Sequence, residues 1–275
     1  MKIDAHQHFW QYEAQKHAWI DESMQRIRQD FMPDDLWPLL QAQQIDGCVA
    51  VQADQSEDET RFLLDLAQQH DFIKGVVGWI DLRSSRLAER LDHYQDEKKL
   101  VGFRHVVQGE ADVNFMLRPD FLRGLQLLQE RGYTYDILIF PHQLGAALEL
   151  VRRMPEQAFV IDHIAKPYIK DGFYDGWGML MCAIADFPNV HCKISGMLTE
   201  ADWKHWEADH FDPYIDLVLD IFGAERLMYG SDWPVCLLAG EYEAGLDLLR
   251  PYLAKLSESE QAAIMGGSAS KFYGL

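Results

Sequence analysis

Two histidines, His6 and His8, lie in the opening stretch MKIDAHQHFW. Successive side chains of a β-strand point to opposite faces, so this spacing aims both imidazoles the same way, about 7 Å apart along the strand. Two imidazoles so placed can hold one metal ion or one substrate. The pair is weak evidence by itself, because 11 histidines in 275 residues give roughly 0.4 such pairs by chance.

Other ionisable side chains stand at the ends of apolar, β-rich runs. His163 ends FVIDH, and Asp232 ends LMYGSD. Arg104 lies in VGFRHVV and Lys193 in VHCKISG. A barrel strand whose inward face becomes ionisable only at its end is more often functional than structural. We therefore expect His163 and Asp232 to be functional, together with His6 and His8.

The order of these runs along the chain predicts the fold that brings the four residues together. Stretches with helical spacing separate most of the runs, for example 59–70, 118–132 and 142–155. This alternation predicts an α/β protein, a single (β/α)8 TIM-like barrel that occupies residues 1–275 as one domain. The eight predicted strands are 2–10, 46–52, 74–81, 101–107, 135–140, 158–164, 190–196 and 226–233.

Active sites of such barrels form at the C-terminal ends of the strands, where the side chains named above would meet. Two longer insertions, 11–35 and 197–213, each follow a predicted strand. We expect both to be lids over the site, with ordinary surface loops as the alternative.

Composition limits the classes of partner. The chain has 25 basic and 44 acidic residues, a net charge of −19, which disfavours nucleic acid and anionic membranes and favours a small neutral or weakly charged molecule. No apolar stretch approaches the length of a membrane span, and no secretory signal pattern is present. The four cysteines have no C-x-x-C spacing. We expect buried free thiols and a cytoplasmic location.

The histidine pair of the first predicted strand, the histidine of the sixth and the aspartate of the eighth together resemble the amidohydrolase superfamily. More narrowly, IDAHQHFW, VGFRHVVQ, FVIDHIAKP, CKISG and YGSDWPV resemble its branch that hydrolyses sugar lactones and a pyrone dicarboxylate lactone. The resemblance spans the chain. It implies a hydrolase that opens a sugar-acid lactone such as L-fuconolactone or L-rhamnonolactone by attack of water, with His6, His8, His163 and Asp232 in the active site.

Binuclear members of the superfamily use a carboxylated Lys or a Glu on strand 4 and a His on strand 5, and this chain departs at both places. Arg104 cannot ligate a metal, and its neighbour His105 should face the other way. His142 follows Pro141 and is interpreted as a non-ligand, because a strand exit at proline re-aims the chain. A two-metal centre is therefore not expected.

Two alternatives remain open for the metal. One divalent ion, with zinc favoured, would be held by His6, His8 and Asp232 with His163 nearby, because three N/O ligands and a water suit catalytic zinc. The same residues could instead work without a metal, as the pyrone lactonases are thought to do.

The resemblance also suggests individual roles. Asp232 would deprotonate the attacking water, and His163, with Arg104 or the ion, would stabilise the oxyanion. Arg104, Lys193 and Trp79 are candidates for binding substrate, the alternatives being interior ion pairs for the two cations and core packing for the tryptophan.

Trp10 and the aromatic residues of 197–213 are candidates to close over the ligand. The remaining histidines are expected at the surface: His17, His70, His93, His191, His205 and His210.

A different reaction on the same fold is the rival hypothesis. A metal-dependent decarboxylase or amide hydrolase of the superfamily would use the same strand-end residues, and its dependence on the ion would distinguish it. A non-catalytic sugar-binding barrel is a third hypothesis, disfavoured because binding has little use for a poised base. The sequence leaves the particular lactone, its ring size and the oligomeric state open.

Overall fold

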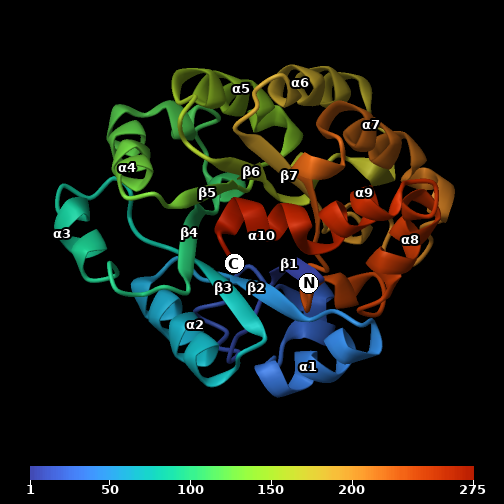
Figure 1. Ribbon diagram of the computed structural model, residues 1–275, viewed down its shortest axis with the longest axis horizontal. Coiled ribbons are helices and arrows are strands. Elements are labelled where there is room, and N and C mark those ends of the chain that lie inside the picture. The colour runs from blue at the N-terminus through green and yellow to red at the C-terminus, as the bar shows by residue number, and fades with distance from the viewer.

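Eight parallel strands form one sheet whose strands follow one another in sequence order, as Figure 1 shows for the computed structural model of residues 1–275. Nearly every strand residue is buried, as expected for parallel strands covered by helices. The predicted (β/α)8 barrel is confirmed. The strands are β1 Ile3–Gln7, β2 Gly47–Val51, β3 Ile73–Gly78, β4 Leu100–His105, β5 Thr134–Ile137, β6 Phe159–Ile161, β7 Val190–Ile194 and β8 Leu227–Tyr229.

Amphipathic helices surround the sheet and pack their apolar faces against it. The helix predicted at 59–70 begins earlier, at Glu57, because the Ser56 side chain accepts a hydrogen bond from the Glu59 N–H and caps it. The helices are α1 Pro33–Ala42, α2 Glu57–Gln69, α3 Leu87–Asp92, α4 Pro119–Glu130, α5 Leu144–Arg153, α6 Asp175–Ala185, α7 Asp212–Phe222, α8 Ala244–Leu253, α9 Glu258–Ala262 and α10 Ser268–Tyr273.

The inside of the barrel is filled from one end by apolar side chains. Nine buried residues from β1, β2, β3, β6, β8 and α10 form one cluster, to which α10 contributes Ala269 and Tyr273. Helix α10 lies across the barrel near both chain termini (Figure 1). The barrel is therefore closed at the end where its strands begin.

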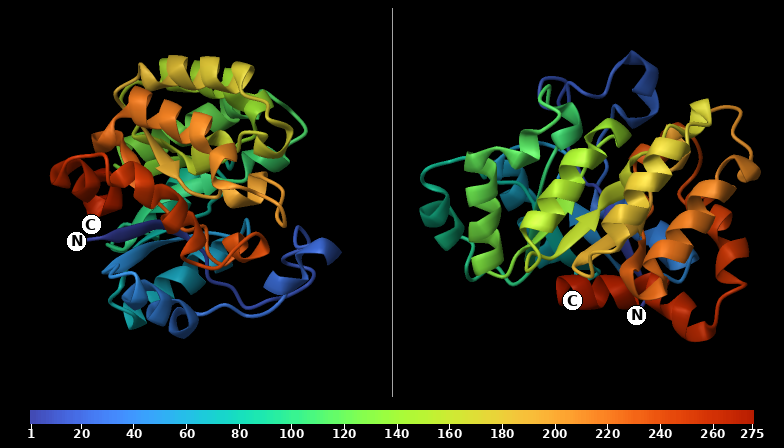
Figure 2. Two further views of the ribbon diagram at one scale, coloured as in Figure 1. Left: turned by 90° about the vertical axis from the view of Figure 1, so that its right-hand side faces the viewer. Right: turned by 90° about the horizontal axis from the view of Figure 1, so that it is seen from above.

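The opposite end of the barrel carries the long segment between β1 and α1. Figure 2 shows this segment, with its 3₁₀ helix Glu22–Ile27, on the side away from both termini. The C-terminal ends of the strands face this side, so any catalytic site of a TIM-type barrel belongs here. No helix of the structure is long and apolar enough to cross a membrane.

Candidate functional site

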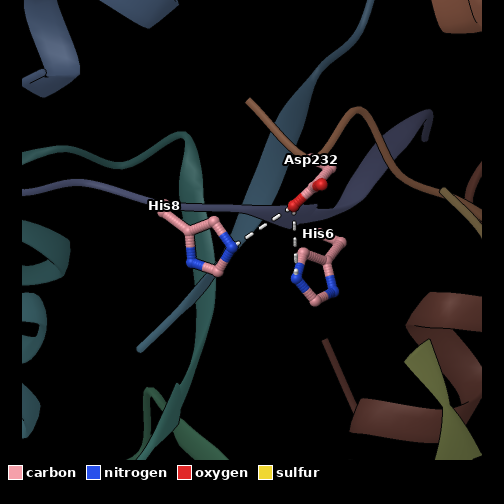
Figure 3. A group of neighbouring side chains, drawn as sticks. All are labelled: His6, His8 and Asp232. Carbon is pink, nitrogen blue, oxygen red and sulfur yellow. Dashed lines mark ion pairs between the residues drawn. The ribbon is translucent and has the colours of Figure 1, made fainter. Parts of the chain in front are cut away.

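His6, His8 and Asp232 lie together at the C-terminal ends of β1 and β8, and Figure 3 shows both imidazoles turned toward one carboxylate oxygen. Asp232 Oδ1 is 3.4 Å from His8 Nε2 and 3.9 Å from His6 Nε2. His163 Nε2 is 3.7 Å from the same oxygen. The structure thus brings together the four residues predicted to be functional.

The backbone places these residues through the closure of the barrel. The Asp232 N–H donates to the His6 carbonyl (2.8 Å), and the His8 N–H donates to the Trp233 carbonyl (2.7 Å). Pairing between β1 and β2 is irregular between Asp4 and Gln7. Such a bulge re-aims side chains at a strand end, and here it lets Ala5 join the interior cluster while His6 faces Asp232.

His163 stands just beyond the end of β6 in a left-handed turn. Residues 163–166 all have positive φ, which is costly for residues other than glycine. The turn packs against Gly196, where an added Cβ would come within 2.4 Å of His163 Nδ1 and 3.1 Å of Asp232 Oδ2. His163 Nδ1 lies 2.9 Å from Ser195 Oγ, which leaves Nε2 directed at Asp232.

The surroundings define the protonation of the cluster. His8 Nδ1 lies 2.7 Å from the Val51 carbonyl, which can only accept, so the proton is on Nδ1 and Nε2 keeps its lone pair. Burial lowers the pKa of His163 to about 4. Burial alone would raise the pKa of Asp232, but the attraction of the His163 imidazole outweighs it and holds that pKa well below its ordinary value. The carboxylate is therefore ionised at neutral pH.

A charged layer supports the cluster from below. His6 Nδ1 is 3.2 Å from Asp162 Oδ1, and Lys193 Nζ is 3.0 Å from that oxygen. Lys193 also pairs with Asp136, which accepts a hydrogen bond from the Tyr273 hydroxyl of α10 (2.9 Å). Lys193 is completely buried and does not line the cavity. Lys193 therefore forms an interior ion pair, which was the alternative to the expected substrate contact.

Arg104 lies beside the cluster at the end of β4. Its Nη1 donates to Asp162 Oδ2 (2.9 Å) and lies 3.2 Å from His6 Nε2. Its Nε and Nη2 donate to Gln52 Oε1 at 3.2 Å and 2.8 Å. Arg104 also lines the cavity, so a substrate contact stays a prediction for it.

A cavity of about 370 Å³ opens above His8, His163 and Asp232, and His6 is buried beneath them. Its polar wall residues include Lys16, Asp54, Gln55, Gln108 and Lys166. A larger hollow of about 830 Å³ lies at the other end of the barrel, beside Met1 and Gly267, and none of the predicted site residues lines it. We assign the site to the smaller cavity because the ionisable cluster forms its floor.

One of the two predicted lids reaches this cavity. Lys16, Ala18 and Trp19 of segment 11–35 line it. The prediction is wrong for segment 197–213, none of whose residues lines the cavity. Neither of its tryptophans lines the cavity: the Trp203 Nε1–H donates to the Thr199 carbonyl and the Trp206 Nε1–H to the Ala239 carbonyl.

Trp79 also lies outside the cavity. Its Nε1–H donates to His105 Nδ1 (3.3 Å), and His105 stacks on Phe115 with ring centroids 4.8 Å apart. His105 therefore faces away from Arg104, as predicted. Trp79 therefore does not contact the site and instead packs among aromatic residues on the helix side of the sheet. Strand alternation turns it outward together with His105.

Three smaller expectations can be compared with the structure. His142 is exposed and lies 3.3 Å from the Tyr168 hydroxyl, away from the ionisable cluster. His17, expected at the surface, is buried, because its ring packs against Trp10 and Tyr12 within the β1–α1 segment. All four cysteines are free, but Cys182 on α6 is exposed and not buried.

Sequence reasoning missed three buried polar residues of the site. Asp162 and Gln52 hold Arg104, as described above. Asp4 accepts hydrogen bonds from the Ser231 N–H (2.9 Å) and the Tyr242 hydroxyl (3.0 Å), which ties β1 to the Asp232 loop. Burial raises the pKa of Asp4 to about 6. The sequence pattern could have identified Asp4 and Asp162, since both are carboxylates within apolar strand sequences.

A parallel barrel with imidazoles and a carboxylate gathered at the ends of β1, β6 and β8 defines a barrel hydrolase site. A family model described as Amidohydrolase matches residues 3–275, and the chain belongs to this family.

Two relatives and one solved structure extend this result. The chain is 42% identical over 286 residues to an L-fucono-1,5-lactonase from Burkholderia multivorans, covering 100% of this chain and 96% of that protein. It is 38% identical to an L-fucono-1,5-lactonase from Burkholderia ambifaria, covering 99% of this chain and 95% of that protein. A crystal structure of an amidohydrolase from Burkholderia multivorans with bound zinc superposes with a TM-score of 0.96 at 42% identity, covering 100% of this chain and 99% of that chain.

The residues of the cluster fit a single divalent ion. Ligand atoms of His6, His8 and Asp232 all lie within 4.8 Å of one another, and all three residues are buried. The Val51 carbonyl holds His8 in the tautomer that a metal requires. Two nitrogens and one carboxylate oxygen are a donor set that suits catalytic zinc.

Proposed function

We propose that this chain hydrolyses a sugar-acid lactone, of the L-fuconolactone type, by adding water to the lactone carbonyl. One observation carries the proposal: Asp232 Oδ1, at the floor of an open cavity, has three imidazole Nε2 atoms within 3.4 to 3.9 Å, two of them from residues that line the same cavity. The names of the two full-length Burkholderia relatives supply the substrate class.

The cavity suits a small polyhydroxylated ring. Its volume of about 370 Å³ lies at the lower end of the range for small-molecule sites. Gln55 and Gln108 can exchange hydrogen bonds with hydroxyls, while Leu138 and Val235 offer apolar contact. Trp19 is 42% exposed at the rim and presents a flat surface to an apolar sugar face.

Asp232 acts as the base in this proposal. Its carboxylate is ionised because neighbouring imidazoles lower its pKa, and it faces the cavity, so it can take a proton from water placed against the lactone carbonyl. After attack the protonated carboxyl group can return the proton to the departing ring oxygen. A lactone has a better leaving group than an amide, which reduces the assistance the reaction needs.

His163 and Arg104 stabilise the oxyanion. When the Ser195 hydroxyl donates to His163 Nδ1, the imidazole proton is on Nε2, which points at the cavity. Arg104 supplies a fixed positive charge on the same floor. Donors held in place before the reaction stabilise developing charge without reorganisation. Zinc, when bound by His6, His8 and Asp232, would polarise the carbonyl and acidify the attacking water.

The test is a pH-indicator screen of the purified protein against L-fucono-, L-rhamnono-, D-arabinono- and galactono-lactones, each with and without a chelator. We expect acid release above the spontaneous rate for at least one lactone and none with the Asp232→Asn variant. No release with any lactone, or equal release by the variant, contradicts the proposal. Chelator response then reports on the metal.

We also propose a cytoplasmic location and a single domain over residues 1–275. The four free cysteines support the location. The barrel strands and the family match, which together span nearly the whole chain, support the single domain. The charge of −19 supports a small molecule as partner, with nucleic acid and anionic membranes disfavoured.

A further inference from the structure

The His6 imidazole is surrounded by charged groups on both of its nitrogens. On the Nδ1 side lie Asp162 Oδ1 at 3.2 Å and Lys193 Nζ at 3.1 Å. On the Nε2 side lie Arg104 Nη1 at 3.2 Å and Asp232 Oδ1 at 3.9 Å. A neutral imidazole has one N–H and one lone pair. Only two of these four neighbours can be its partners.

The distances decide which two they are. Lys193 Nζ and Arg104 Nη1 can only donate, so a neutral ring can accept from only one of them. The ring N–H needs an acceptor: Asp162 Oδ1 lies 3.2 Å from Nδ1, whereas Asp232 Oδ1 is 3.9 Å from Nε2 and too far. Lys193 can direct its protons to Asp136 and Asp162 instead. The proton is therefore on Nδ1 and the lone pair on Nε2. That lone pair is the one a metal would use, and the Arg104 Nη1–H already donates to it.

Contacts other than His6 hold Arg104 in this position. Asp162 Oδ2 accepts from Nη1, and both the side chain and the backbone carbonyl of Gln52 accept from Nη2. Arg104 is only 4% exposed, and its guanidinium stays charged at all physiological pH values. The Arg104 guanidinium is therefore held in place by residues at the ends of β2 and β6, whether or not His6 accepts a hydrogen bond from it.

We propose that Arg104 competes with a divalent ion for Nε2 of His6 and thereby sets the zinc affinity of the site. One lone pair cannot serve both, and the fixed charge of Arg104, whose Nη1 lies 3.2 Å from Nε2, would repel a cation bound there. This inference rests on the ligand geometry and not on the identity of the substrate.

The test measures zinc affinity directly. Protein stripped with a chelator is titrated with zinc in competition with a chromophoric zinc indicator, for the wild type and for Arg104→Gln. We expect the variant to bind zinc at least about tenfold more tightly, which corresponds to loss of roughly one charge-assisted contact. Equal or weaker binding by the variant would overturn the proposal.

A matched control separates competition from a general effect of charge. Lys166 lines the same cavity and pairs with Glu200 (2.8 Å) but makes no contact with His6. Lys166→Gln removes the same charge, and we expect its zinc affinity to change by less than about threefold. A gain equal to that of Arg104→Gln would mean that the net charge of the pocket sets the affinity, and would overturn the proposal.

A second variant protects the test against misfolding. Should circular dichroism show that Arg104→Gln is unfolded, Gln52→Leu decides, because it removes the side-chain anchor of Arg104 and keeps every charge and every ligand. We expect Gln52→Leu to bind zinc more tightly than wild type by about threefold or more. Unchanged affinity in this folded variant would overturn the proposal.

Discussion

The backbone N–H of Asp232 donates a hydrogen bond to the carbonyl of His6, at 2.8 Å. This bond belongs to the seam between the first and last strands, so the same contact that closes the barrel also places Asp232 beside His6. The carboxylate and the imidazole are consequently held together by main chain, and their separation does not depend on a flexible loop. Substitutions of either side chain should therefore change the chemistry while leaving the seam intact.

Replacement of Asp232 by Asn should abolish most turnover. The amide cannot take a proton from water, so we expect kcat to fall by about 10² to 10⁴ while KM changes little. Steady-state kinetics on the lactone identified by the screen measure both constants. Turnover near the wild-type value in Asp232→Asn would remove Asp232 from the role of base.

Gly196→Ala should inactivate the protein by displacing His163. An added Cβ would lie 2.4 Å from His163 Nδ1, and Gly196 has φ +58. Because a displacement of about 1 Å at a site can cost 10²-fold in rate, we expect kcat/KM to fall by at least about that factor. The matched control is Gly145→Ala on α5, where nothing lies within 4 Å of the added Cβ and activity should be unchanged. Equal activities of the two variants would contradict the packing described for His163.

Lys193→Met tests whether Lys193 supports the structure or binds substrate. Its removal leaves Asp136 and Asp162 buried with one cation fewer, and such changes cost about 3 to 5 kcal/mol. We expect the free energy of unfolding in urea to fall by that amount, whereas Lys204→Met at an exposed position should leave it unchanged. A variant of normal stability whose KM alone rises would instead support substrate binding.

Glu59→Gln should change how stability depends on pH. Glu59 on α2 is 2% exposed, accepts a hydrogen bond from the Ala53 N–H, and burial raises its pKa to about 7. Between the ordinary pKa near 4.5 and pH 7 the unfolded chain releases this proton while the folded chain keeps it, so the carboxyl group destabilises the fold as pH rises.

At pH 8 we therefore expect Glu59→Gln to be more stable than wild type by about 1 to 3 kcal/mol, and at pH 4 to be equal to it. Urea unfolding at both pH values measures the difference. The exposed Glu156→Gln is the control and should show no such pH dependence. A stability gain that is the same at pH 4 and pH 8 would show that ionisation of Glu59 is not its cause.

The sequence predicted the barrel because parallel strands buried on both faces read as short apolar runs. It also located His6, His8, His163 and Asp232, since each interrupts such a run near its end. It did not show the depth of Lys193, which faces the barrel interior but lies below the cavity, because the stagger between neighbouring strands determines depth. Gln52 could not be recognised, since a single amide at a strand end has no distinctive pattern until its partner Arg104 is in place.

Helix α10 follows all eight strands in the chain, and its Tyr273 hydroxyl reaches Asp136 inside the barrel. During synthesis the strands leave the ribosome before this helix does. The nascent barrel therefore keeps its lower end open to water, with the carboxylate of Asp136 lacking one hydrogen-bond donor, until α10 has been made. Completion of the barrel interior is thus tied to the synthesis of α10, after the eighth strand has been made.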